Sequence, residues 1–164
     1  SGGVGSFAIQ IAKARGCHVI ATASTANQDL LKQLGADVAI DYTKQKFEDL
    51  VHDVDFALLP VGGETMARTY GVMKKGGTMA TLISRADPTE LQKRGIREAP
   101  IFSHPNSVEL AEITKLIDAG KIKPVVTQVL PLTDAAKADE QAETHHTRGK
   151  IVLKIADEPE LKKD

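Results

Sequence analysis

The opening stretch Ser1-Gly2-Gly3-Val4-Gly5 decides the fold, because a glycine-rich loop here leads directly into a helical pattern. Apolar residues recur at helical spacing over 6–15, and Gly16 is a typical helix stop. In a doubly wound α/β fold, the first turn from strand to helix has this composition. Its small residues let backbone N–H groups approach a dinucleotide pyrophosphate at the positive end of the helix. An ordinary tight turn is the alternative interpretation of these glycines.

Strand and helix patterns alternate along the rest of the chain. We expect strands at 17–23, 37–40, 54–61, 78–83, 96–102, 125–130 and 150–155. We expect helices through Leu30–Leu34, at 46–52, at 64–74, from the Asn106 cap to Gly120, and at 133–143, with a surface loop at 84–94. Strands separated by helices predict an α/β fold: a Rossmann-type doubly wound parallel sheet with helices on both faces. One nucleotide-binding domain would span 1–155, followed by a charged tail at 156–164.

Composition limits the classes of function. The 164 residues are 41% hydrophobic and 26% charged with a net charge of −1, which fits one globular domain and argues against a nucleic-acid partner. No apolar stretch approaches the roughly 20 residues that span a bilayer, so we expect no membrane partner. The single Cys17 excludes an internal disulfide framework, and a reducing cytoplasm is the simplest compartment.

The end of the first expected strand bears on the choice of cofactor. NAD-binding domains usually carry an Asp or Glu there, about 20 residues beyond the loop, to bind the adenosine ribose. Here the sequence is Ser24-Thr25-Ala26-Asn27, and no carboxylate occurs before Asp29. Neutral hydroxyl and amide groups accommodate a 2′-phosphate that a carboxylate would repel. This segment therefore favours NADP(H) over NAD(H), although it contains no arginine.

The whole chain resembles the medium-chain dehydrogenase/reductase superfamily, in particular its zinc-independent, NADPH-dependent quinone oxidoreductase branch and the related enone reductases. The order and spacing of several short motifs carry the resemblance. These are Gly2-Gly3-Val4-Gly5 with Ala8-Ile9-Gln10-Ile11-Ala12-Lys13, Leu34-Gly35-Ala36-Asp37, Ile40-Asp41-Tyr42, Val61-Gly62-Gly63-Glu64-Thr65, Lys75-Gly76-Gly77 and Arg148-Gly149-Lys150-Ile151-Val152-Leu153.

The resemblance implies a cofactor role for several positions. The residues expected along the pyrophosphate are Gly2, Gly3, Val4 and Gly5. Those expected around the adenosine 2′-phosphate are Ser24, Thr25, Asn27 and Tyr42. We expect Val61 and Gly62 to lie beneath the cofactor. The residues expected near the nicotinamide are Ile83, Phe102 and Ser103. Those expected near the phosphate and ribose are Gly149 and Lys150. For Tyr42, packing at a strand end is as good an explanation as cofactor contact. For Lys150, an exposed strand position is as good an explanation as phosphate contact.

The resemblance implies hydride transfer from NADPH to a quinone or an α,β-unsaturated carbonyl, a small-molecule partner, without a metal. It assigns no catalytic residue, and it allows a homodimer. Relative to the family, the first strand and an N-terminal GroES-like domain are absent from this chain, so we expect the fragment alone to be inactive. A non-catalytic NADPH-binding or assembly module and the cofactor domain of a zinc-dependent alcohol dehydrogenase remain alternatives.

Three further residues admit a chemical interpretation and a simpler one. His145 and His146 could serve as metal ligands or as an acid–base pair, but adjacent histidines at a polar helix end are typical of a solvated surface. Cys17 is better explained as a small packed residue than as a nucleophile, since nothing nearby in sequence would lower its pKa. We therefore predict no metal site.

Overall fold

The structure is a computed structural model that describes residues 1–156; apart from Ala156, the charged tail expected at 156–164 lies outside the described residues. The chain divides into two compact units, Ser1–Ala39 with Thr114–Asp164, and Ile40–Ile113. Within residues 1–156 the longest helix has 12 residues, and no helix is long and apolar enough to cross a bilayer.

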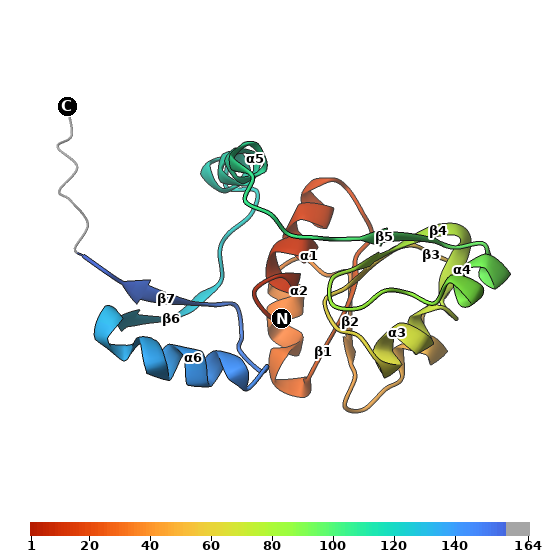
Figure 1. Cartoon of the computed structure of the whole chain (residues 1–164), viewed down its shortest axis with the longest axis horizontal. Coiled ribbons are helices and arrows are strands. Elements are labelled where there is room, and N and C mark those ends of the chain that lie inside the picture. Colours follow the sequence, from red (N-terminus) through yellow and green to blue (C-terminus); the bar gives the residue numbers. More distant parts are fainter. Residues whose placement is uncertain (157–164) are drawn as a thin grey trace. The chain divides into compact units, whose positions relative to one another are not determined.

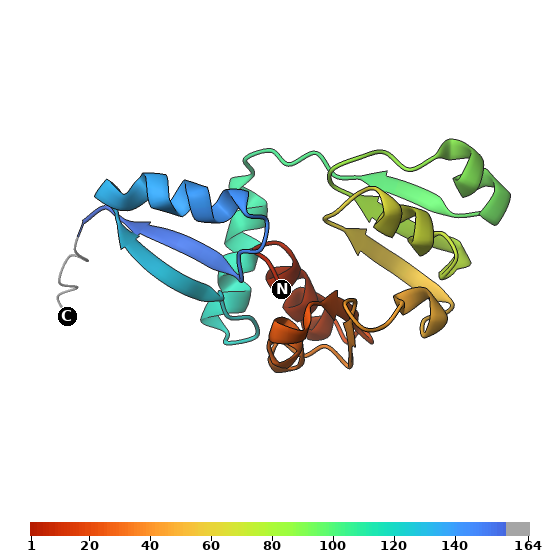
Figure 2. The ribbon, with the colours of Figure 1, turned by 90° about the horizontal axis from the view of Figure 1, so that it is seen from below.

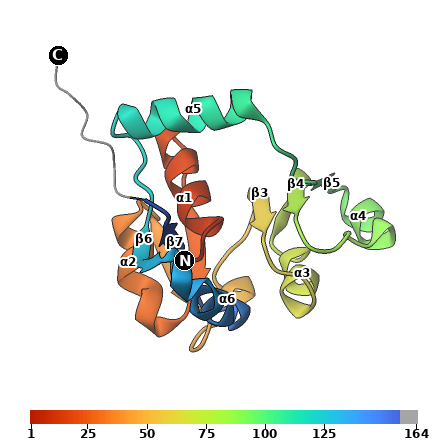
Figure 3. The same ribbon diagram turned by 60° about the vertical axis from the view of Figure 1, so that its left-hand side comes forward.

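The first part of the chain forms a helix-covered pair of strands (Figure 1). Its elements are α1 (Gly5–Ala14), β1 (Ile20–Ala23), the short 3-10 helix η1 (Thr25–Asn27), α2 (Gln28–Gln33) and β2 (Val38–Asp41). Helices α1 and α2 lie side by side (Figure 3) because Ile9 of α1 and Leu30, Leu31 and Leu34 share one buried cluster with Val19 and Ala23. This cluster fixes the glycine-loop helix against the β1 segment.

The C-terminal part of the chain contributes a second pair of strands. Its elements are α5 (Ser107–Asp118), β6 (Val126–Pro131), η3 (Leu132–Asp134), α6 (Ala135–Glu143) and β7 (Lys150–Lys154). Strand β6 pairs with β7 in parallel, with Val129 opposite Val152. Helix α6 connects the two strands and runs along their pair (Figure 2). As expected, the Asn106 side chain caps α5, accepting from the N–H groups of Val108 and Glu109 at 3.0 and 3.2 Å.

The middle of the chain forms a three-stranded parallel sheet in the order β3–β4–β5. Its elements are η2 (Phe47–Asp49), β3 (Val54–Leu59), α3 (Glu64–Thr69), β4 (Met73–Thr81), α4 (Pro88–Arg94) and β5 (Arg97–Pro100). Met79 at the centre of the sheet is fully buried, and Met66 and Tyr70 pack in the same cluster. The sheet thus holds the ends of three parallel strands in register.

These ladders confirm the α/β class with parallel strands. Strand β1 pairs with β2, and β3 pairs with β4; across residues 1–156 no ladder joins β1 to β3. The doubly wound order expected from the sequence places one further strand between these two. The described strands therefore form separate small sheets.

The expectation of a surface loop over 84–94 is wrong, because Pro88–Arg94 forms helix α4. The Asp87 side chain caps it by accepting from the Thr89 N–H at 2.8 Å, Pro88 occupies the first turn, and Gly95 ends it in the left-handed conformation. These are ordinary start and stop signals of a helix. The helix was not predicted because it is short and its apolar residues lack a strong helical periodicity.

Two expected helices are also too long. The helix predicted over 64–74 ends at Thr69, and β4 begins at Met73, which pairs with Val54 ahead of a register shift. Strand pairing overrides local helix preference over these residues. The helix predicted at 46–52 is only the 3-10 turn Phe47–Asp49.

Candidate functional site

The glycine loop leads into α1, as the sequence predicts. The N–H of Ser6 donates to the Gly2 carbonyl at 3.0 Å, and the helix proper begins at Gly5. Its N-cap residue, Val4, provides no side-chain hydrogen bond. Since the first N–H groups of a helix have no acceptor within it, this end of α1 carries an uncompensated partial positive charge.

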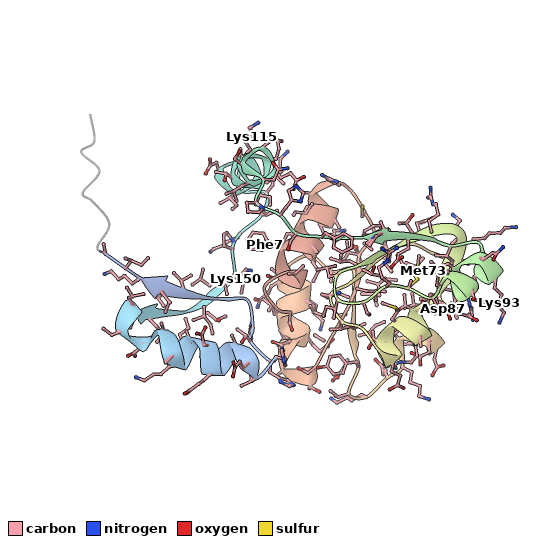
Figure 4. The ribbon with its side chains drawn as sticks, in the orientation of Figure 1. Phe7, Met73, Asp87, Lys93, Lys115 and Lys150 are labelled. Atoms are coloured by element: carbon pink, nitrogen blue, oxygen red, sulfur yellow. The ribbon has the colours of Figure 1, made fainter. Side chains whose placement is uncertain are left out.

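Strand β7 begins against the same loop. Gly2 and Gly149 form a parallel bridge, and the Gly149 N–H donates to the Ser1 carbonyl at 3.0 Å. Lys150 follows at the first position of β7 (Figure 4). A Cβ atom on Gly3 would lie 2.8 Å from the Lys150 ammonium nitrogen, so this ammonium lies directly over Gly3. The structure therefore brings together the two segments that the resemblance places near the cofactor phosphates.

The residues at this end of α1 fit the phosphate portion of a dinucleotide. Gly3 has no side chain to cover its backbone, and Lys150 supplies a positive charge. The N-terminus of α1 has no side-chain cap. Ser6 in the first turn is fully buried, and within residues 1–156 its hydroxyl oxygen has no hydrogen-bond partner. Glycines, a cation and a helix N-terminus are the groups that bind phosphate oxygens in this fold class.

The segment after β1 forms a compact polar turn in the same unit. The Asn27 amide donates to the Ser24 hydroxyl at 3.2 Å, and its backbone N–H donates to the Ser24 carbonyl at 2.9 Å. Thr25 begins η1 between them. Gln28, which sequence reasoning did not select, anchors the turn by donating to the Ala23 carbonyl at 2.8 Å. The turn contains hydroxyl and amide groups and no carboxylate.

Tyr42 follows β2 in a turn that its neighbours hold. The backbone N–H and hydroxyl of Thr43 both donate to the Asp41 carboxylate, at 3.0 and 2.6 Å. Asp41 is only 8% exposed, whereas the Tyr42 side chain is 53% exposed. The exposed phenol is available to a ligand, and the buried aspartate beside it serves the turn.

A second set of predicted residues lies at the carboxyl edge of the β3–β4–β5 sheet. Leu59, Thr81 and Pro100 end the three strands and are paired in register. Two residues beyond each strand end stand Val61, Ile83 and Phe102, which are 49%, 70% and 75% exposed. Ligands of open α/β sheets bind at this edge of the strands. Ser103 follows Phe102 and is also exposed.

Gly62 allows the β3 and β4 ends to approach closely. A Cβ atom at Gly62 would lie 2.7 Å from the hydroxyl oxygen of Ser84. Sequence reasoning missed Ser84, and its position directly after Ile83 is the signal that could have found it. The glycine loop, the Ser24–Asn27 turn, Gly149 and Lys150 thus belong to one unit, whereas the strand-edge residues and Tyr42 belong to the other.

The remaining chemical candidates do not gather into a centre. His145 has a φ of 57° in the turn after α6, and both histidines are exposed. Cys17 is a free, exposed cysteine, so the expectation that it is packed is wrong. Among residues 1–156 no three His, Cys, Asp or Glu side chains come together as a potential metal site.

Comparison with known proteins shows the family of this chain. Residues 34–153 match the family model described as zinc-binding dehydrogenase. The mitochondrial NAD(P)H oxidoreductase RTN4IP1 of Mus musculus is 35% identical over 182 aligned residues, covering 94% of this chain and 46% of that protein. The chloroplastic NADPH-dependent alkenal/one oxidoreductase of Arabidopsis thaliana is 36% identical over 157 residues, covering 93% of this chain and 38% of that protein.

A solved structure agrees with these relatives. The quinone oxidoreductase from Coxiella burnetii superposes with a TM-score of 0.86 at 31% identity, covering 94% of this chain and 50% of that one. The chain spans about half the length, or less, of the relatives that it matches. The family model, the sequence relatives and the superposition all agree with the motif pattern: this chain belongs to the zinc-binding dehydrogenase family of the medium-chain dehydrogenase/reductase superfamily.

Proposed function

We propose that this chain is the NADPH-binding part, over residues 1–155, of an oxidoreductase that reduces quinones or α,β-unsaturated carbonyls. The position of the Lys150 ammonium over Gly3, at an α1 end that no side chain caps, is the observation that carries the proposal. A positive charge beside open backbone at a helix N-terminus suits the phosphate groups of a dinucleotide, and this supports the proposal. The similarity to the NADPH-dependent alkenal/one oxidoreductase of Arabidopsis and to the quinone oxidoreductase of Coxiella also supports the proposal.

The polar turn at Ser24–Asn27 supports NADPH over NADH. Its hydroxyl and amide groups can donate to a 2′-phosphate, and no carboxylate stands in the turn to repel it. The exposed phenol of Tyr42 is the second group proposed for this phosphate. Val61, Ile83 and Phe102 would cover one side of the nicotinamide and exclude water from it, because each presents an apolar side chain at the strand edge.

When bound, NADPH supplies the hydride, so the chain's own residues bind and orient the cofactor. We propose no side chain as nucleophile or as general acid. The reducing cytoplasm remains our proposed compartment on the basis of the free thiol of Cys17. The proposed enzyme acts on a quinone or an enone and allows a homodimer.

Cofactor titration of the natural full-length protein tests the proposal. We expect nicotinamide fluorescence to report binding of NADPH at least about tenfold tighter than NADH, since one charge-assisted contact is worth about 1.5–3 kcal/mol. Equal affinity would remove the 2′-phosphate argument. The protein should also oxidise NADPH with a quinone or an enone after exhaustive chelation, whereas turnover that requires added zinc would favour the zinc alcohol dehydrogenase alternative.

A further inference from the structure

The loop between β4 and α4, residues 82–87, carries two residues to the carboxyl edge of the sheet. Ile83 is 70% exposed there, and Ser84 closely approaches Gly62. A loop keeps side chains at fixed positions only where other groups hold its backbone. The partners of its N–H groups therefore decide how well this edge is preorganised.

Two side chains from neighbouring elements hold the end of this loop. The Glu98 carboxylate on β5 accepts from the Ala86 N–H at 2.7 Å. The Tyr70 hydroxyl, just after α3, accepts from the Asp87 N–H at 2.7 Å; Asp87 lies where the loop meets α4 (Figure 4). Ala86 and Tyr70 are 3% and 7% exposed. Consecutive N–H groups are thus fixed from two sides of the loop.

Glu98 is itself firmly held. One carboxylate oxygen also accepts from the Thr81 hydroxyl at 2.8 Å, and the other accepts from Nε of Arg85 at 3.0 Å. Burial acts to raise the pKa of Glu98, but the hydrogen bonds from Ala86, Thr81 and Arg85 outweigh it and hold the pKa below its usual value. Through these hydrogen bonds the ionised carboxylate on β5 connects to the end of β4 and to the loop.

We infer that Glu98 and Tyr70 are positioning residues, which fix the 82–87 loop so that Ile83 and Ser84 align the nicotinamide half of bound NADPH. The inference rests on the proposed function. Neither Glu98 nor Tyr70 is assigned a contact with the cofactor. A purely structural role for these two residues would alter binding of every part of the cofactor, whereas a positioning role alters binding of the nicotinamide half alone.

The experiment compares two ligands in the natural full-length protein: NADPH, and 2′,5′-ADP, which lacks the nicotinamide. We expect Glu98→Ala to weaken NADPH binding about tenfold and to lower kcat by a similar factor, with 2′,5′-ADP affinity unchanged. Glu98→Gln keeps the oxygen that accepts from Ala86 and Thr81, so it should recover most of this loss. Tyr70→Phe removes one acceptor and keeps the ring, and it should weaken NADPH binding about threefold.

Glu48→Gln is the matched control, because Glu48 pairs with Arg68 in the same unit and bonds to no atom of the loop. We expect it to bind both ligands as the wild type does. If Glu98→Ala does not fold, Tyr70→Phe and Glu98→Gln decide by the same comparison. Equal losses for NADPH and 2′,5′-ADP, or no loss for either, would overturn the positioning role alone. A wild-type protein that binds neither ligand would overturn the proposed function and this inference together.

Discussion

The side-chain amide of Gln10 in α1 bonds to both backbone groups of Lys123, which lies 113 positions away in sequence. Its nitrogen donates to the Lys123 carbonyl at 3.0 Å, and its oxygen accepts from the Lys123 N–H at 2.8 Å. The same nitrogen donates to the Ser6 carbonyl at 2.9 Å. Because Gln10 is 9% exposed, these bonds are shielded from water. They tie the glycine-loop helix to the segment that leads into β6.

Replacing Gln10 by leucine should therefore destabilise the fold. The Lys123 N–H and carbonyl would lose their partner in a partly buried place, and each such loss costs about 1–3 kcal/mol. We expect the free energy of unfolding to fall by about 2–4 kcal/mol, measured by urea denaturation. Gln33→Leu, at an exposed position of α2, is the control, with a change within about 0.5 kcal/mol. A loss below that of the control would contradict the anchoring role of Gln10.

Lys150→Met should weaken NADPH binding without unfolding the protein. The change removes the ammonium over Gly3 and keeps most of the alkyl chain, so a charge-assisted contact with phosphate is lost. We expect about tenfold weaker binding at low ionic strength, and a smaller difference as salt rises.

The control for this charge change is Lys154→Met, on the same strand four residues further along. It removes an equal charge on the same face, at about 13 Å along the strand. Equal losses in the two variants would mean that net charge, rather than a contact near Gly3, accounts for the effect.

Local sequence signals predicted most of the elements but not their limits. The glycine loop, the α1 helix and the Asn106 cap are encoded within a few residues, and the structure confirms them. The boundary between α3 and β4 depends on the pairing of Met73 with Val54, a contact that no short window contains. Helix α4 was missed for a different reason, since its cap at Asp87 was visible but its apolar periodicity was weak.

The same distinction applies to the candidate site. Motifs indicated the glycine loop and Lys150, and the structure places them together. The anchors of the strand edge were not predictable, because Glu98 and Tyr70 reach loop 82–87 from separate elements. Their role in positioning the loop beside the nicotinamide half stays a prediction, which the titrations above test.

Two glycine substitutions should separate folding from binding. A Cβ atom on Gly149 would collide with the backbone carbonyl oxygen of Val125, and its φ of 60° is unfavourable for alanine. The three atoms nearest to a Cβ on Gly3 all belong to the flexible end of Lys150, at 2.8–3.0 Å. We therefore expect Gly149→Ala to lower the free energy of unfolding by about 2 kcal/mol or more.

Gly3→Ala should change stability by less than about 1 kcal/mol but weaken NADPH binding, because the methyl group displaces the Lys150 ammonium and covers the backbone. Thermal unfolding and cofactor titration of both variants make the comparison. If Gly3→Ala is the more destabilised variant, or if it binds NADPH as tightly as the wild type, the geometry of this loop does not have the role proposed for it.

The Asp37 carboxylate should make stability depend on acid pH. The Val19 N–H donates to it at 2.7 Å, and the Lys13 ammonium donates at 2.9 Å; together they hold the pKa of Asp37 below its usual value. The folded state therefore binds this proton less readily than the unfolded chain. The stabilisation is present above the unfolded pKa of about 4 and is lost as pH falls through the lower folded pKa.

Urea unfolding of the wild type from about pH 6 to 2.5 should show this loss, and Asp37→Asn should reduce the slope of stability against pH, because its amide does not titrate there. Lys13→Met is the informative partner variant. It removes the cation but keeps the Val19 hydrogen bond, which is the larger cause of the pKa shift, so the slope should be reduced and not abolished. Identical curves for the wild type and Asp37→Asn would show that other carboxylates govern acid unfolding. A slope for Lys13→Met as low as that of Asp37→Asn would assign the effect of Asp37 to the ion pair instead.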